Sequence, residues 1–120
     1  MAKKSKYNNI KVEYKGIEFD SKKERDRYIE LDLLERAKEI KNLERQKKFN
    51  LLEGFTDNQG KKERSISYIA DFAYIDNRTG EYIVEDVKSD FTRKKAEYII
   101  KRKMFKKKYP DYVFFENVRR

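Results

Sequence analysis

The side chains best placed to do chemistry are charged groups inside apolar segments. Asp71 stands in the middle of the apolar run 68–74, where an unpaired charge costs on the order of several kcal/mol unless it is paired or bound to a metal. Asp86 and Lys88 lie two residues apart in the apolar segment 82–88, so on a strand they point to the same face. Alone, such a triplet is equally well explained as an ion pair contributing less than about 1 kcal/mol.

Pairing between the two segments brings a second carboxylate to Asp71. The segment 76–80 (Asp-Asn-Arg-Thr-Gly) is typical of a hairpin loop. Residues whose numbers add to 156 or 157 then face each other, which places Asp71 across from Glu85 or Asp86. Two carboxylates on one sheet beside Lys88 favour a hard-cation site. The shared face of Asp86 and Lys88 favours Asp86 as the partner, whereas a strand bulge would exchange it for Glu85.

A third acidic group, Glu24, comes from a predicted helix. Ser21-Lys22-Lys23-Glu24 matches a helix capping box, and apolar residues follow at helical spacing to about Lys38. At 100° per residue, Glu24 falls within about 20° of Leu31 and so lies on the core-facing stripe. Glu24 either caps the helix or joins the acidic cluster, and the two roles are compatible.

Composition excludes several kinds of chemistry. The 120 residues contain no His and no Cys, which excludes an imidazole base, a zinc ribbon and a thiol nucleophile. Carboxylates, Lys, Tyr and Ser remain, with a cation held by oxygen ligands. No apolar run reaches the roughly 18 residues that span a bilayer, and no hydrophobic segment follows the charged amino terminus. We therefore expect a soluble intracellular protein without a membrane partner.

The net charge of +9 is concentrated near the carboxyl end. Residues 93–108 hold nine Lys or Arg and one acid, Glu97, a local charge of +8. Such a segment is typical of a polyanion-binding surface, although a solvated lysine-rich helix also explains it. The residues of this segment expected to contact a polyanion are Lys94, Lys95, Tyr98, Lys101 and Arg102, with Tyr98 equally well explained by packing.

A second basic segment is the polar loop 54–64. Its Lys61 and Lys62 either contact the same polyanion or belong to an ordinary disordered loop. Gln46 and Lys47 are the weakest candidates for the same role.

These residues require a small set of elements to position them. One α/β domain over residues 8–120 follows a disordered basic tail, 1–7, with a mixed sheet and a basic helix laid across one face. The predicted elements are a hairpin (11–19), a helix (21–38), a short strand (49–53), a loop (54–64), two strands (65–75 and 82–88), a helix (92–109) and a last strand (112–118). The apolar stripe of the second helix is expected to be Ala96, Ile99, Ile100 and Met104.

Together, Asp71, the triplet Asp86-Val87-Lys88, the helix residue Glu24 and the basic helix resemble the PD-(D/E)xK nuclease superfamily. This is the restriction-endonuclease-like fold, with core order α-β-β-β-α-β. Among its members, the chain most resembles small phage-encoded endonucleases and archaeal-type Holliday junction resolvases. The resemblance spans about residues 20–118, and it departs from the family pattern at Ala70, where a Pro is common.

The resemblance implies Mg²⁺- or Mn²⁺-dependent hydrolysis of phosphodiester bonds in DNA. Asp71, Asp86 and the backbone carbonyl of Val87 would hold the metal, with Glu24 as a direct or water-mediated ligand. Lys88 would orient the attacking water and stabilise the transition state. The implied protein is a cytoplasmic phage or prophage homodimer acting on branched or junction DNA. A nicking or restriction-like endonuclease, a noncatalytic nucleic-acid-binding module and an inactive member of the fold are the alternatives.

Overall fold

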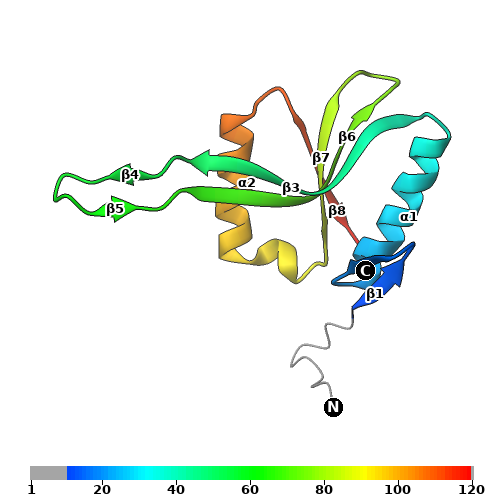
Figure 1. Ribbon diagram of the computed structural model, residues 1–120, viewed down its shortest axis with the longest axis horizontal. Coiled ribbons are helices and arrows are strands. Elements are labelled where there is room, and N and C mark those ends of the chain that lie inside the picture. The colour runs from blue at the N-terminus through cyan, green and yellow to red at the C-terminus, as the bar shows by residue number, and fades with distance from the viewer. Residues whose placement is uncertain (1–10, 120) are drawn as a thin grey trace, which may run out of the picture.

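The computed structural model describes residues 11–119 and shows two helices against a mixed sheet (Figure 1). The elements, in chain order, are β1 (Val12–Tyr14), β2 (Ile17–Phe19), α1 (Lys22–Arg36), β3 (Ile40–Leu52), β4 (Phe55–Thr56), β5 (Lys62–Glu63), β6 (Ile66–Asp76), β7 (Tyr82–Lys88), the 3₁₀ turn η1 (Thr92–Lys94), α2 (Ala96–Lys108) and β8 (Val113–Val118). The tail predicted over residues 1–7 lies outside the described part of the chain.

The central sheet has the strand order β3-β6-β7-β8. Its first two pairings are antiparallel, and β8 lies parallel to β7. A parallel neighbour requires a crossover, and α2 supplies it. The mixed α/β fold with a mixed sheet and two helices confirms the coarse prediction. Within the described residues, no helix is long and apolar enough to cross a membrane.

The first helix begins where the capping pattern predicts. The Ser21 hydroxyl accepts a hydrogen bond from the Glu24 backbone N–H at 3.2 Å, which satisfies one of the free amide groups of the first turn. Leu31, on the predicted inner stripe, is fully buried, and Glu24 is only 6% exposed. The inward direction of Glu24 is therefore confirmed.

Two apolar clusters cover the opposite faces of the sheet. One includes Tyr68, Ala70 and Ala73 and packs against α2, whereas Phe72 and Tyr74 belong to the other, which packs against α1. Ala70 and Ala73 are an odd number of residues apart, so the strict alternation of side chains along β6 is interrupted between them. Asp71 lies at this interruption.

The first core strand is much longer than predicted. β3 runs over Ile40–Leu52 instead of 49–53 and pairs with β6 along most of its length. Its charged first half lacks the apolar alternation that would indicate a strand, because β3 is an edge strand with its solvent side open. Asn42 and Gln46 also have positive φ angles, so this part of β3 departs from the regular conformation that strand patterns describe.

The prediction of a loop over residues 54–64 is also wrong. It contains the paired strands β4 and β5, and together with the ends of β3 and β6 it forms an arm that projects beyond α2 (Figure 1). Main-chain pairing depends little on side-chain type, so a polar sequence with two Gly residues gave no strand signal.

The second helix differs from the prediction in both start and orientation. Thr92 opens only the short turn η1, and α2 starts at Ala96 after the extended residue Lys95. Its buried residues are Tyr98 and Phe105, seven positions apart, whereas Ile100 is 56% exposed. The two large rings bury more area than the aliphatic stripe and determine which face meets the sheet.

Candidate functional site

The centre of the site is a pair of carboxylates on β6 and β7. The ladder pairs Phe72 with Glu85, so the next positions, Asp71 and Asp86, lie opposite each other. Asp71 Oδ2 accepts the Val87 backbone N–H at 2.8 Å, which places its carboxylate beside Asp86. Of the two registers that the sequence allows, the structure has the one that pairs Asp71 with Asp86.

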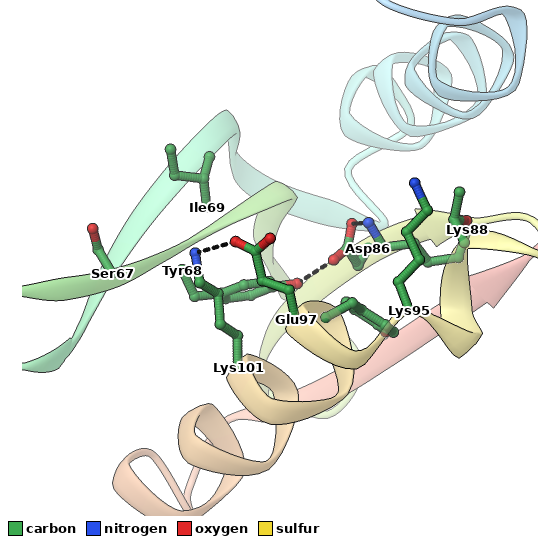
Figure 2. Close-up of a pocket in the computed structure, with 10 residues that line it drawn as sticks. Ser67, Tyr68, Ile69, Asp86, Lys88, Lys95, Glu97 and Lys101 are labelled. Carbon is green, nitrogen blue, oxygen red and sulfur yellow. Dashed lines mark hydrogen bonds and ion pairs between the residues drawn. The ribbon is translucent and has the colours of Figure 1, made fainter. Parts of the chain in front are cut away.

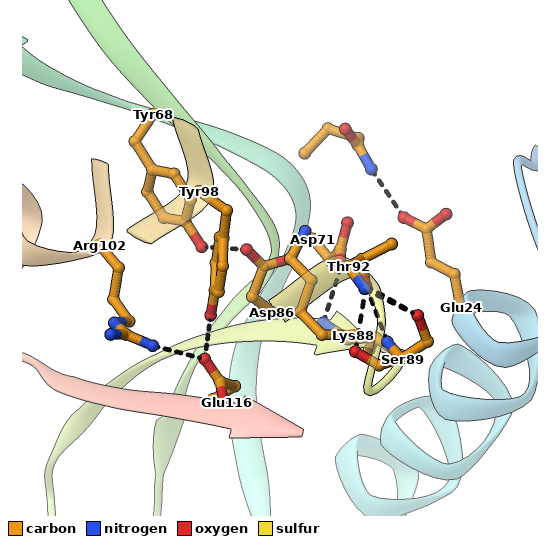
Figure 3. Close-up of polar contacts among 12 residues, drawn as sticks. Glu24, Tyr68, Asp71, Asp86, Lys88, Ser89, Thr92, Tyr98, Arg102 and Glu116 are labelled. Atoms are coloured by element: carbon orange, nitrogen blue, oxygen red, sulfur yellow. Dashed lines mark hydrogen bonds and ion pairs between the residues drawn. The ribbon is translucent and has the colours of Figure 1, made fainter. Parts of the chain in front are cut away.

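Tyr68 and Lys88 both contact Asp86, and Lys88 is itself held by Tyr98 (Figure 3). Tyr68 donates its hydroxyl to Asp86 Oδ2 at 2.5 Å, and Lys88 Nζ lies 3.3 Å from Asp86 Oδ1. The Lys88 ammonium also lies over the Tyr98 ring, 4.7 Å from its centroid. Tyr98 is in turn held by Glu116, which accepts its hydroxyl at 2.5 Å. The lysine is therefore positioned from two sides.

Glu24 approaches this pair from the start of α1 (Figure 3). Its Oε1 accepts a hydrogen bond from Gln46 Nε2 at 2.7 Å. Its negative charge raises the pKa of Asp71, so the three acidic groups belong to one electrostatic unit.

Ionisation of both Asp71 and Asp86 at once is unfavourable, and the pKa values of both side chains are raised. Burial is the main reason why the pKa of Asp86 rises to about 8, and the adjacent Asp71 raises it further. Burial likewise raises the pKa of Asp71 to about 6. Lys88 opposes both shifts without cancelling them. The two carboxylates thus retain a proton where free carboxyls would have lost it, or they need a cation to replace it.

Glu85 does not share this site. It is fully buried on the other face of β7, where Arg27 donates to it at 2.6 and 3.0 Å. Tyr74 and Asn117 complete its hydrogen bonds. All of its negative charge is therefore engaged in holding α1 to the sheet. Asp86 is the acid that lies beside Lys88.

A groove of about 490 Å³ opens above Asp86 and Lys88 (Figure 2). Ser67 and Ile69 at the base of the arm form one wall, and α2 forms the other with Lys95 and Lys101. Three of the five predicted DNA contacts in residues 93–108, Lys95, Tyr98 and Lys101, therefore line the groove above Asp86. The Tyr98 side chain is 9% exposed, which favours packing over direct contact with a ligand.

The other predicted cations lie elsewhere. Lys94 and Arg102 line a separate hollow of about 280 Å³ with Arg93 and Glu116, and Arg102 donates to Glu116 at 3.2 Å. Lys61 and Lys62 are exposed on the arm, which places them outside the lining of the groove. The structure thus divides the predicted basic surface into three parts, and only one of them adjoins the acids.

The donor set suits a small oxygen-seeking cation, although it is not a closed cage. In the described residues, no three Asp or Glu side chains are close enough to form a metal-binding group. The buried pair has two carboxylates and the charge deficit that a divalent ion would correct. Mg²⁺ is usually bound by one or two carboxylates while water completes its shell. The residues present therefore fit this ion.

Two residues in the site gave little or no signal in the sequence. Tyr68 occurs in an apolar run and reads as a core aromatic, and only the register reveals its bond to Asp86. Gln46 was considered only as a contact for DNA, yet its amide binds Glu24. A polar residue in a charged edge strand is ordinary, and its contact spans 22 residues, which no local pattern encodes.

The fold and site define a small mixed α/β protein with a buried carboxylate pair and a lysine at the end of a basic groove. The chain belongs to the family described as Protein of unknown function (DUF1064), which it matches over residues 4–119. No curated protein and no solved structure matches the chain.

Proposed function

We propose that this protein is a metal-dependent DNA endonuclease of the PD-(D/E)xK superfamily that acts on branched DNA. The order α1-β3-β6-β7-α2-β8 supports this proposal, since it agrees with the α-β-β-β-α-β core of that fold. The observation that carries the proposal is the juxtaposition of Asp71, Asp86 and Lys88 on neighbouring strands, with Asp86 and Lys88 lining a groove that Lys95 and Lys101 also line.

The chain's own residues would share the work as follows. Asp71, Asp86 and the Val87 carbonyl would hold Mg²⁺ or Mn²⁺, with Glu24 as a direct or water-mediated ligand. A bound divalent ion supplies Lewis acidity, lowering the pKa of a water and neutralising charge on the phosphate. Tyr68 fixes the orientation of Asp86 through its hydroxyl.

Lys88 has the position of a transition-state stabiliser. Its ammonium borders the groove and contacts Asp86 at 3.3 Å. There it can orient a water by hydrogen bonding and stabilise negative charge that develops on the phosphate. Since the chain contains no His, a lysine with carboxylates is the arrangement that its composition permits.

Binding of the substrate is assigned to the lysines of the groove. Lys95, just before α2, and Lys101 on α2 line the groove beside Asp86 and would contact backbone phosphates, which gives salt-sensitive binding without base readout. Lys61 and Lys62 on the arm would contact DNA further from the cut. Symmetric cutting of a four-way junction requires two active sites, and hence a homodimer.

The direct test is incubation with labelled four-way junction, flap and linear duplex DNA in Mg²⁺, Mn²⁺ or EDTA. We expect cleavage of branched DNA that requires the metal and is lost in Asp86→Asn and Lys88→Ala. Lys41→Ala, an exposed change outside the groove, is the matched control. Cleavage in EDTA would contradict the mechanism, and equal cutting of linear duplex would favour a nicking or restriction-like endonuclease.

A noncatalytic nucleic-acid-binding module is the second candidate, favoured by the net charge of +9. It leaves the buried acids unexplained, because carboxylates repel phosphate. Binding of all three DNAs without cleavage in any metal would favour it.

A further inference from the structure

Gln46 has a left-handed backbone conformation at a point where the register between β3 and β6 is unbroken. Its φ is +51° in the middle of β3, a left-handed conformation that residues with a Cβ rarely adopt. The pairs on either side, Arg45 with Phe72 and Lys47 with Ala70, have the same register. No inserted residue therefore accounts for the turn of the chain at this point.

Asn42, the other positive-φ residue of β3, provides the contrast. Its φ of +58° coincides with a register shift between Lys41 and Glu44. A bulge explains this conformation, and Asn tolerates it better than most residues. Gln46 has neither a register shift nor an Asn side chain, and it lies opposite Asp71, where the alternation of side chains along β6 is interrupted.

The Gln46 side chain shows what the conformation achieves. Gln46 is exposed, yet its amide reaches inward to Glu24 Oε1 at 2.7 Å, and Glu24 is 6% exposed. The unbroken register places Gln46 opposite Asp71, whose pKa responds to the charge of Glu24. The strained residue thus lies beside two of the three acidic groups.

We propose that Gln46 is a positioning residue of the acidic site. Its left-handed backbone directs the amide at Glu24, and donation from Nε2 fixes that carboxylate while leaving Oε2 outside the Gln46 contact. Strained backbone that persists without a packing reason is characteristic of functional sites. This role rests on the proposed function, because the fixed Glu24 serves the cation that Asp71 and Asp86 would share.

The test separates positioning from a simple structural tie between β3 and α1. Gln46→Asn keeps an amide and suits a positive φ, but it is one methylene too short for Glu24. Gln46→Gly relieves the strain and removes the amide. Asn42→Gly, at the explained bulge, is the matched control. Each chain is examined by thermal unfolding in EDTA and by calorimetric titration with Mn²⁺ alone.

We expect the Gln46 variants to unfold at the wild-type temperature or above it, while their affinity for Mn²⁺ falls about 10-fold or more. Single-turnover cleavage should fall by a similar factor with DNA affinity unchanged. Asn42→Gly should leave both Mn²⁺ affinity and cleavage unchanged. In a Glu24→Gln background, Gln46→Asn should have no further effect on Mn²⁺ affinity.

The measurements distinguish failure of the proposed function from failure of the positioning role of Gln46. A wild-type chain that does not bind Mn²⁺ overturns the proposed function and this inference with it. A wild-type chain that binds Mn²⁺ no more tightly than Gln46→Asn overturns the positioning role alone. Lower unfolding temperatures in both Gln46 variants, with Mn²⁺ affinity unchanged, would assign Gln46 to structure.

Discussion

Asp71 and Asp86 lie side by side on two neighbouring antiparallel strands, where Asp71 Oδ2 accepts the Val87 backbone N–H at 2.8 Å. Two carboxylates can do this without repulsion only while they share a proton or a cation. The Asp86 side chain is almost fully buried, at 1% exposure, and Asp71 is partly exposed, so water screens Asp86 poorly. This one relationship determines the pH dependence, the metal dependence and the stability of the site.

The stability of the metal-free protein should fall as the pH rises from about 5 to 8. Burial and Asp71 raise the pKa of Asp86 to about 8 in the folded state, against the opposing effects of Lys88 and Tyr68. A carboxyl whose pKa is raised on folding stabilises the protein fully below its unfolded pKa, near 4, and loses that contribution as the pH rises through its folded pKa.

Asp86→Asn removes this titration. We expect the variant to be more stable than wild type at pH 8 by about 1–2 kcal/mol and to show a flatter pH dependence. Urea unfolding in EDTA from pH 5 to pH 8 measures both quantities. Asp111→Asn, on an exposed turn, is the control, and parallel pH profiles for wild type and Asp86→Asn would contradict the prediction.

A divalent cation should stabilise the folded protein because it replaces the shared proton. At a concentration 100 times its dissociation constant, an ion that binds only the folded state adds about 2.7 kcal/mol to the unfolding free energy. We expect Mn²⁺ to raise the unfolding temperature more at pH 8 than at pH 5, where protons compete. Asp86→Asn should lose the shift, and an equal shift in that variant would argue against the site.

The sequence predicted those parts of the site that depend on local periodicity. Alternation along 82–88 placed Asp86 and Lys88 on one face, and the capping box placed Glu24 correctly at the start of α1. The loop between β6 and β7 limited the register to two choices. Such signals survive because a strand or helix repeats over a few residues.

Contacts between distant segments were not predictable in the same way. The orientation of α2 depends on Tyr98 and Phe105 packing against the sheet, whereas the aliphatic pattern favoured Ile100, which is exposed. The charged half of β3 is a strand because β6 pairs with it. Tertiary packing and edge pairing override local preference in both cases.

Breaking the ion pair behind the site should destabilise the fold without changing the chemistry. Arg27 is the charged partner of the fully buried Glu85, so Arg27→Met leaves an uncompensated charge that costs about 3 kcal/mol. Adding Glu85→Gln should restore much of the loss. Urea unfolding measures stability, and the cleavage rate of the folded fraction should stay near that of wild type; additive losses in the double variant would contradict the coupling.

The two groups of cations in the basic segment 93–108 should contribute differently to DNA binding and cleavage. Lys95 and Lys101 line the groove above Asp86, whereas Lys94 and Arg102 line the hollow beside Glu116. We expect Lys95→Ala/Lys101→Ala to weaken binding and lower single-turnover cleavage about 10-fold or more. Each lost phosphate contact should reduce the salt slope of binding by about 1.

Lys94→Ala/Arg102→Ala removes the same amount of charge from the same basic segment, residues 93–108, and is the matched variant. It should weaken binding at low salt, where long-range attraction matters, and leave the cleavage rate at saturating DNA unchanged. Equal losses of saturated cleavage in the two double variants would show that net charge, and not the groove, determines the effect.

The Tyr98 ring should matter to cleavage more than its hydroxyl. Lys88 Nζ lies 4.7 Å from the centroid of this ring, and such a contact contributes about 0.5–2 kcal/mol depending on desolvation. Tyr98→Phe keeps the ring and loses only the bond to Glu116, whereas Tyr98→Leu removes the ring and frees the lysine. We expect single-turnover cleavage to fall about 10-fold in Tyr98→Leu and to stay within about 3-fold of wild type in Tyr98→Phe. Both variants lose the Glu116 contact, so a similar rate for the two would mean that the ring does not position Lys88.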